Sequence, residues 1–190
     1  DVEVRDVFRQ AFASVALKGK RLLFVIPDGT RSAPLPLCFR IITEELLDVA
    51  ARVDFMIATG THLGMDDAAI ERHLGITQAE REGKYSAVGI YNHDWQHNLL
   101  DIGTITADEV AAASDGLMAQ DIKILINANI VNYDYLIIVG PVFPHEVVGF
   151  SGGNKYLFPG ISGGNMIDAT HWLSALITCH EIIGTKYTPV

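Results

Sequence analysis

Apolar residues along the chain follow two kinds of pattern. Short continuous apolar runs are typical of strands buried on both faces of a sheet, and they lie at residues 21–28, 53–60, 122–130 and 133–140. Helix-like spacing or capping marks residues 34–53, 65–75, 106–120 and 165–184. This alternation predicts an α/β fold with a mostly parallel sheet and flanking helices, in a Rossmann-like layered architecture.

Two of the predicted helices carry end signals. Thr106 is followed three positions later by Glu109, which is the spacing of a capping box. Gly75 follows a helix with acidic residues in its first turn and predicts its end. Two further strand-like segments, 85–93 and 99–106, predict a small β-insertion around residues 85–106.

Composition limits the classes of partner. The 190 residues are 49% hydrophobic, enough to bury a core, and we expect one α/β domain over 1–190. A net charge of -9 argues against nucleic acid, which needs a basic surface. No apolar run approaches the ~18 residues of a membrane span, so we expect no membrane partner and a cytoplasmic protein. Cys38 and Cys179 are too far apart in the sequence to suggest a disulfide framework.

Polar side chains follow three of the predicted strands. Ligands of open α/β sheets bind beyond the carboxyl ends of the strands, so we expect these side chains to converge there: Asp28, Thr30, Arg31, Thr61, His62, His145 and Lys155. Each also has a structural interpretation, because Asp-Gly is a common turn pair and His62 could assist a helix cap. His171, about two turns into the last predicted helix, could face the same pocket. The remaining histidines have no such neighbours and are interpreted as structural: His73, His93, His97 and His180. Residues 93–97 are interpreted as a surface loop and Trp172 as core.

A glycine-rich segment, residues 144–164, is the most specific feature of the chain and is called the Gly-rich loop below. It reads PHEVVGFSGGNKYLFPGISGG and holds SGG twice, at 151–153 and at 162–164, the second directly before a predicted helix. Glycine lets backbone N–H groups approach an anion, and a helix N-terminus favours one. The alternative is a pair of plain glycine turns. Lys155 could be a phosphate counter-ion or a nucleophile, although Asn154 breaks the Walker pattern.

Several motifs together resemble a known family. DGTR at 28–31, GTH at 60–62, PHEVVGFSGGNK at 144–155 and a histidine sixteen residues after Lys155 resemble the N-terminal domain of the nickel-pincer lactate racemases. The resemblance extends from about Asp28 to His171. It implies racemisation or epimerisation of a small 2-hydroxy acid, with hydride transfer to a nickel pincer nucleotide, a pyridinium-3,5-bisthiocarboxylic acid mononucleotide that carries nickel.

The resemblance also implies residue roles. Lys155 would hold the cofactor covalently, and His171 would be the protein ligand to nickel. His62 and His145 would act as acid and base on opposite sides of the substrate. The remaining roles would fall to Asp28 and Arg31, which line the site, and to cofactor contacts at Thr30, Ser151, Gly152 and Gly153.

Members of that family have a second domain that completes the substrate pocket, and nothing in this sequence corresponds to it. We therefore interpret the chain, which opens at Asp1 without a methionine, as the N-terminal cofactor-binding domain of a longer two-domain protein, incomplete for catalysis alone. The expected partners are the 2-hydroxy acid substrate and that missing C-terminal domain. Two other functions stay open: a non-catalytic phosphate- or nucleotide-binding module, and a metal hydrolase with His62, His145 and His171 as ligands.

Overall fold

The computed structural model describes residues 1–190 and divides into two compact units. The first unit comprises Asp1–Ile57, Gly64–Asn92 and Asn129–Gly140, and the second comprises Ala58–Leu63, His93–Ala128 and Pro141–Val190. The chain thus passes between the units several times. That the 190 residues form one α/β domain stays a prediction. No helix is long and apolar enough to cross a bilayer.

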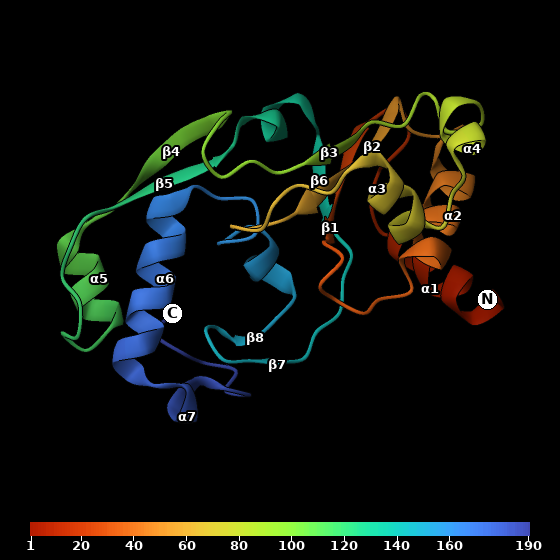
Figure 1. The fold of residues 1–190 in the computed structure, drawn as a ribbon. Helices are drawn as coiled ribbons and strands as arrows, with labels where there is room; N and C mark the ends of the chain where they lie inside the picture. The colour runs from red at the N-terminus through yellow and green to blue at the C-terminus, as the bar shows by residue number, and fades with distance from the viewer. The chain divides into compact units, whose positions relative to one another are not determined.

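A four-stranded sheet forms the first unit and confirms the predicted α/β class (Figure 1). Its order is β3-β2-β1-β6, and the pairs β1/β6 and β2/β3 are parallel. The strands are β1 (Arg21–Pro27), β2 (Arg52–Ala58), β3 (Ile90–Asn92) and β6 (Tyr135–Ile138). The strand order changes direction between β1 and β6, and such a switch point is where open parallel sheets bind ligands.

Helices in the first unit are α1 (Val2–Ala13), α2 (Leu35–Leu46), α3 (Asp67–Leu74) and α4 (Gln78–Glu82). Three neighbouring aromatic rings join α2 to the sheet in the core. The ring centroid of Phe55 lies 4.8 Å from that of Phe39 on α2 and 5.4 Å from that of Phe24 on β1. The predicted helix at 34–53 ends early, at Leu46, because the chain turns and enters β2 at Arg52. Gly75 ends α3 in the left-handed conformation, at φ 65°, as predicted.

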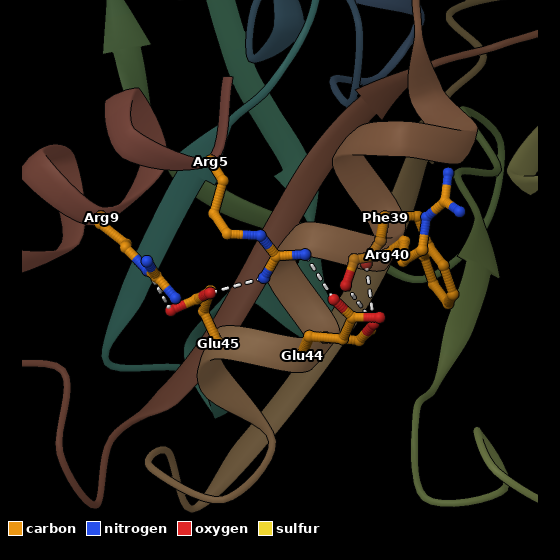
Figure 2. A network of polar contacts seen from close by, with 7 residues as sticks. Arg5, Arg9, Phe39, Arg40, Glu44 and Glu45 are labelled. Carbon is orange, nitrogen blue, oxygen red and sulfur yellow. Dashed lines mark hydrogen bonds and ion pairs between the residues drawn. The ribbon is translucent and has the colours of Figure 1, made fainter. Parts of the chain in front are cut away.

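Helix α1 has no buried residue and was not predicted from the sequence. Two arginines join it to the end of α2 (Figure 2). The Glu45 carboxylate forms ion pairs with a guanidinium nitrogen of Arg5 at 2.6 Å and with Nε of Arg9 at 3.0 Å, and Arg5 also pairs with the Glu44 carboxylate. The helix is therefore attached by charge as well as by Phe8 and Phe12, which pack against the core partly buried.

An antiparallel ribbon and a long helix form the second unit. Its elements are β4 (Leu99–Ile105), α5 (Ala107–Ala113), β5 (Ile122–Asn127), β7 (Pro144–His145), β8 (Gly149–Phe150), the 3-10 helix η2 (Gly153–Tyr156), α6 (Gly164–Ile177) and α7 (Cys179–Ile182). A second 3-10 helix, η1 (Ala128–Asn132), starts at Ala128 of this unit and continues with residues of the first unit. β4 pairs with β5, and α6 packs against β5 (Figure 1). Thr106 and Glu109 form the predicted capping box of α5.

Three expectations about residues 85–184 are wrong. The segments at 85–93 and 99–106 do not make an insertion together, since β3 pairs with β2 while β4 pairs with β5. The last helix does not run to residue 184, because Thr178 has a φ of 82° and separates α6 from α7. Trp172 is 58% exposed and not core, because α6 turns Met166, Ala169 and Leu173 inward instead.

Candidate functional site

The DGTR motif is a tight turn at the end of β1, where the first unit has its switch point. Asp28 is buried, and its carboxylate accepts the backbone N–H of Thr30 at 3.0 Å as well as the hydroxyl of Thr30. The N–H of Arg31 donates to the carbonyl of Asp28 at 3.3 Å. The turn therefore holds a buried carboxylate next to the half-buried Arg31, and the Thr30 hydroxyl serves that carboxylate.

The GTH motif follows β2 and belongs to the second unit. Gly60 donates its N–H to the carbonyl of Gly160 at 3.0 Å, and His62 donates its N–H to Thr59 at 2.9 Å. These bonds hold the segment of the exposed His62 against the stretch that follows Lys155. The bond from Gly60 thus links the GTH segment to the end of the Gly-rich loop, and the convergence of the site side chains stays a prediction.

His93 is a residue whose role the sequence did not reveal. It is buried, and its Nε2 lies 3.0 Å from the carbonyl oxygen of Ser162 while its Nδ1 lies 3.1 Å from the side-chain amide of Asn127. Its own carbonyl accepts the Thr59 hydroxyl at 2.8 Å. Burial lowers the pKa of His93, because the charged ring would lose its water, and the Ser162 carbonyl and the charge of Asp94 offset this loss only in part.

The surface-loop prediction for residues 93–97 is therefore wrong for His93 and right for His97. His97 is exposed and pairs with Asp94 at 2.9 Å. His93 instead joins the GTH segment, β5 and the start of α6. Periodicity gives no signal of this, because the three partners are far from His93 in the sequence.

The first half of the Gly-rich loop forms the β7–β8 hairpin. Pro144 pairs with Phe150 and His145 with Gly149. His145 is 6% exposed, and its Nδ1 accepts the N–H of Val147 at 3.0 Å. The hairpin therefore fixes the position of this predicted acid–base residue.

The first SGG motif combines a closing bond with an open backbone. The Ser151 hydroxyl accepts the N–H of Phe143 at 3.1 Å and donates to the carbonyl of Pro141 at 3.3 Å, which fastens the hairpin base. Gly152 has a φ of 87°, and a Cβ there would come within 2.5 Å of the Val142 side chain. Gly153 has a φ of 49° with open space where a Cβ would point. An anion could thus approach the backbone at Gly153.

Lys155 lies on η2 directly after this open backbone. It is half-buried, its N–H donates to Gly152 at 3.1 Å and its carbonyl accepts the N–H of Gly160 at 3.0 Å. The lysine backbone is therefore fixed on both sides. A fixed lysine next to exposed glycine suits attachment of a group that carries a phosphate.

His171 is an exposed residue about two turns into α6. Its Nδ1 lies 2.7 Å from the carbonyl oxygen of Ile167, which can only accept a hydrogen bond. The Nδ1 therefore carries the proton, and Nε2 keeps a lone pair. This arrangement is typical of metal-ligating histidines, whose other nitrogen donates to a carbonyl or carboxylate.

The second SGG motif has a packing role. Gly163 donates its N–H to Leu125 at 2.8 Å, and a Cβ there would lie 2.9 Å from the side chain of Leu99. A Cβ on Gly164 would lie 3.3 Å from the ring of Trp95. The Ser162 hydroxyl is fully buried and has no hydrogen-bond partner. The interpretation as glycine turns therefore fits 162–164 better than an anion site does.

The predicted site residues divide between the units. Asp28, Thr30 and Arg31 belong to the first, whereas the second holds His62, His145, Ser151, Gly152, Gly153, Lys155 and His171. That all of them border one cleft stays a prediction. No group of three or more His, Cys, Asp or Glu side chains could hold a metal ion, so the hydrolase alternative lacks a ligand set.

Comparison with known proteins identifies the family. The model of the lactate racemase N-terminal domain matches residues 5–182. The chain belongs to the lactate racemase N-terminal domain family. It is 28% identical over 170 residues to a lactate racemase of Thermoanaerobacterium thermosaccharolyticum, with 88% of this chain and 34% of that protein covered. It is also 28% identical over 157 residues to a lactate racemase of Lactiplantibacillus plantarum, with 81% and 33% covered.

Solved structures agree with this family. A Thermotoga maritima protein matches with a TM-score of 0.84 and 28% identity, over 98% of this chain and 44% of that one. The lactate racemase apoprotein of T. thermosaccharolyticum matches with a TM-score of 0.60 and 25% identity, over 84% and 37%. The chain spans about a third of the length of the curated relatives that it matches.

Proposed function

We propose that the chain is the cofactor-binding part of a lactate racemase-like isomerase that racemises or epimerises a small 2-hydroxy acid. The observation that carries the proposal is the family match over residues 5–182, which includes every predicted site residue. Two curated relatives are lactate racemases. Because the chain covers only a third of them, the activity belongs in this proposal to a longer protein, which we also propose to be cytoplasmic.

The proposed cofactor is the nickel pincer nucleotide, attached covalently to Lys155. The residues fit such a group in two respects: Gly153 leaves open space next to a lysine whose backbone is fixed, and His171 keeps a lone pair on Nε2 for a metal. When bound, the cofactor would supply sulfur ligands that select nickel and a ring that accepts hydride. A metal held this way needs one protein ligand, which agrees with the absence of a cluster of protein ligands.

The proposed cofactor contacts would use two kinds of donor, backbone N–H groups and side-chain hydroxyls. The phosphate would meet backbone N–H groups at Gly152 and Gly153. Thr30 and Ser151 use their hydroxyls within the protein, so each would have to exchange one of these bonds to donate to a phosphate.

Two histidines would move the protons. Racemisation requires a proton acceptor on either face of the substrate carbon, because each enantiomer presents its hydroxyl and hydrogen in mirror arrangement. We assign His62 and His145 to these roles. Arg31 has the planar, permanently charged group that binds a carboxylate in two places, and the buried Asp28 shapes the turn that carries it.

Intact-mass and metal analysis of protein from its native host tests the proposal. We expect a mass increase localised to Lys155 and about one nickel per chain. A Lys155→Arg variant keeps the charge and should lose the adduct. Protein made in a host without the cofactor pathway should be unmodified and serves as the blank. An unmodified Lys155 in nickel-free native protein would contradict the proposal and favour the phosphate-binding module.

A further inference from the structure

The β7–β8 hairpin places Glu146, to which the proposed function gives no role, next to the proposed acid–base residue His145. His145 Nδ1 accepts the N–H of Val147 at 3.0 Å, and the carboxylate of Glu146 lies 3.7 Å from the same nitrogen. The His145 side chain is 7% exposed, whereas that of Glu146 is 66% exposed. An exposed carboxylate thus lies within ion-pair distance, but beyond hydrogen-bond distance, of one nitrogen of a buried ring.

The bond from Val147 sets the tautomer of His145. A backbone N–H can only donate, so Nδ1 must present a lone pair, and the neutral ring then carries its proton on Nε2. Because Nδ1 bonds within the hairpin, a proton exchanged with a ligand has to pass through Nε2. In this tautomer Nε2 already carries a proton, and it has no lone pair to accept another.

Acceptance of a proton at Nε2 therefore requires the other neutral tautomer, which forms when Nε2 releases its proton to water and Nδ1 takes one from water, so that the ring stays neutral. When the ring takes a proton from a hydroxyl, the O–H bond breaks, an Nε2–H bond forms, and the neutral Nδ1–H ring becomes imidazolium. The reverse step returns the same proton, and neither step changes an oxidation state. In both of these forms, the neutral Nδ1–H ring and the imidazolium, called the working forms below, Nδ1 carries a proton. The hydrogen bond from Val147 cannot then form, because two N–H groups cannot bond each other. The Glu146 carboxylate is then the acceptor at hand.

We propose that Glu146 is a positioning residue that holds the proton on His145 Nδ1 while Nε2 exchanges protons with the substrate. Val147 holds the resting tautomer, and Glu146 holds the working forms. The role in racemisation rests on the proposed function. The change of the Nδ1 partner from Val147 to Glu146, called the exchange of partners below, is a property of the hairpin itself. A carboxylate that orients and stabilises an imidazolium performs the same task in hydrolytic triads.

Neighbouring elements carry other charges that need a control. α6 contacts the hairpin through Ser174, whose hydroxyl donates to the Glu146 carbonyl at 3.3 Å, and Gly184 donates to Gly149 at 2.9 Å. The titratable side chains on α6, α7 and the segment after α7 are Asp168, His171, Cys179, His180, Glu181, Lys186 and Tyr187. Glu181→Gln makes the same change of charge as Glu146→Gln and is the matched control.

Nitrogen-15 NMR of the histidine rings in the 190-residue chain gives a direct test, with His145→Gln used to assign the signal. We expect neutral His145 to show the Nε2–H tautomer. Glu146→Gln should move the protonation midpoint of His145 down by about 0.2 to 0.7 pH unit, as an exposed ion pair allows. Glu181→Gln should move it less. An Nδ1–H neutral tautomer in the wild type, or equal shifts in the two variants, would overturn the proposal.

A kinetic measurement on the full-length, cofactor-loaded protein separates this inference from the proposed function. Glu146→Gln should lower kcat about two- to fivefold with KM unchanged, and Glu146→Asp should recover part of the loss. An unchanged kcat would overturn the positioning role. A loaded protein that racemises no 2-hydroxy acid would overturn the proposed function, while the NMR result would still decide the exchange of partners.

Discussion

In three histidines of the second unit a single partner decides which nitrogen of the neutral ring carries the proton: Nδ1 in His171, and Nε2 in His93 and His145. His171 donates from Nδ1 to a carbonyl of its own helix, and His93 donates from Nε2 to the Ser162 carbonyl. His145 accepts at Nδ1 from a backbone N–H. The partner atom thus selects the tautomer of each ring, which suits His171 to the proposed role of metal ligand and makes His93 a link between distant segments.

The lone pair of His171 predicts its effect on nickel. His171→Ala removes the proposed ligand but leaves Lys155 intact, so nickel retained after dialysis of the loaded protein should fall about tenfold or more while the mass adduct persists. His180→Ala removes an exposed histidine of α7 and should change neither quantity. Equal nickel content in wild type and His171→Ala would show that the ligand assignment is wrong.

Burial of His93 predicts a dependence of stability on pH. The unfolded chain takes up a proton at this ring near its ordinary pKa of 6.5, whereas burial lowers the pKa in the folded state. The unfolded state therefore binds more protons as the pH falls below 6.5. The stabilisation is fully present above that pH and is lost as the pH decreases, with a slope of up to about 1.4 kcal/mol per pH unit.

Urea denaturation of the wild type from pH 7.5 to 5 measures this slope. His93→Gln should reduce it, whatever its effect on stability at pH 7.5. His97→Gln, which changes a side chain that is 75% exposed, should leave the slope close to that of the wild type. The assignment to His93 is wrong if the His97 variant accounts for the larger part.

At the scale of elements, charge contributes to the attachment of one helix. α1 presents no fully buried face, and its arginines meet two neighbouring glutamates at the end of α2 (Figure 2). Hydrogen bonds from Arg9 and Arg5 lower the pKa of the Glu45 carboxyl. A helix attached in this way should respond to salt more than the helices that cover the sheet with apolar residues.

Glu45→Gln tests that attachment. The variant keeps the shape of the side chain but loses both ion pairs, and we expect the free energy of unfolding to fall by less than about 1 kcal/mol at low salt, because such pairs are partly exposed. The difference from wild type should shrink at 1 M salt. Asp48→Asn, which removes a carboxylate just beyond α2, is the matched control. A loss that does not respond to salt would assign the effect to packing.

At the scale of the whole molecule, racemisation would need both proposed bases. In the longer, loaded protein, His62→Gln and His145→Gln should each lower racemisation in both directions by about 10²- to 10⁴-fold, because a full turnover uses both residues. With enzyme in excess, single-turnover formation of the keto acid should survive for opposite enantiomers in the two variants. The two-base assignment would not survive the same preference in both variants, or near-normal racemisation.

Local rules made part of this architecture predictable. The apolar runs of β1 and β2, the capping box at Thr106 and the left-handed Gly75 follow from side chains a few residues apart. The motifs at Asp28 and Lys155 were found in the same way, since a strand followed by glycine and a polar residue signals a site within a short window. Such features need no knowledge of distant partners.

The sequence alone thus determined the fold class, the family and the position of the Gly-rich loop, because these depend on residues close together in the chain. Only the tertiary structure decided that His93 is buried, that Trp172 is exposed and that Gly163 is needed for contact with Leu99 and Leu125. Each of these depends on segments far apart in the sequence. Burial and close approach are set by what packs against a residue, and a helix pattern or a repeated SGG cannot specify that partner.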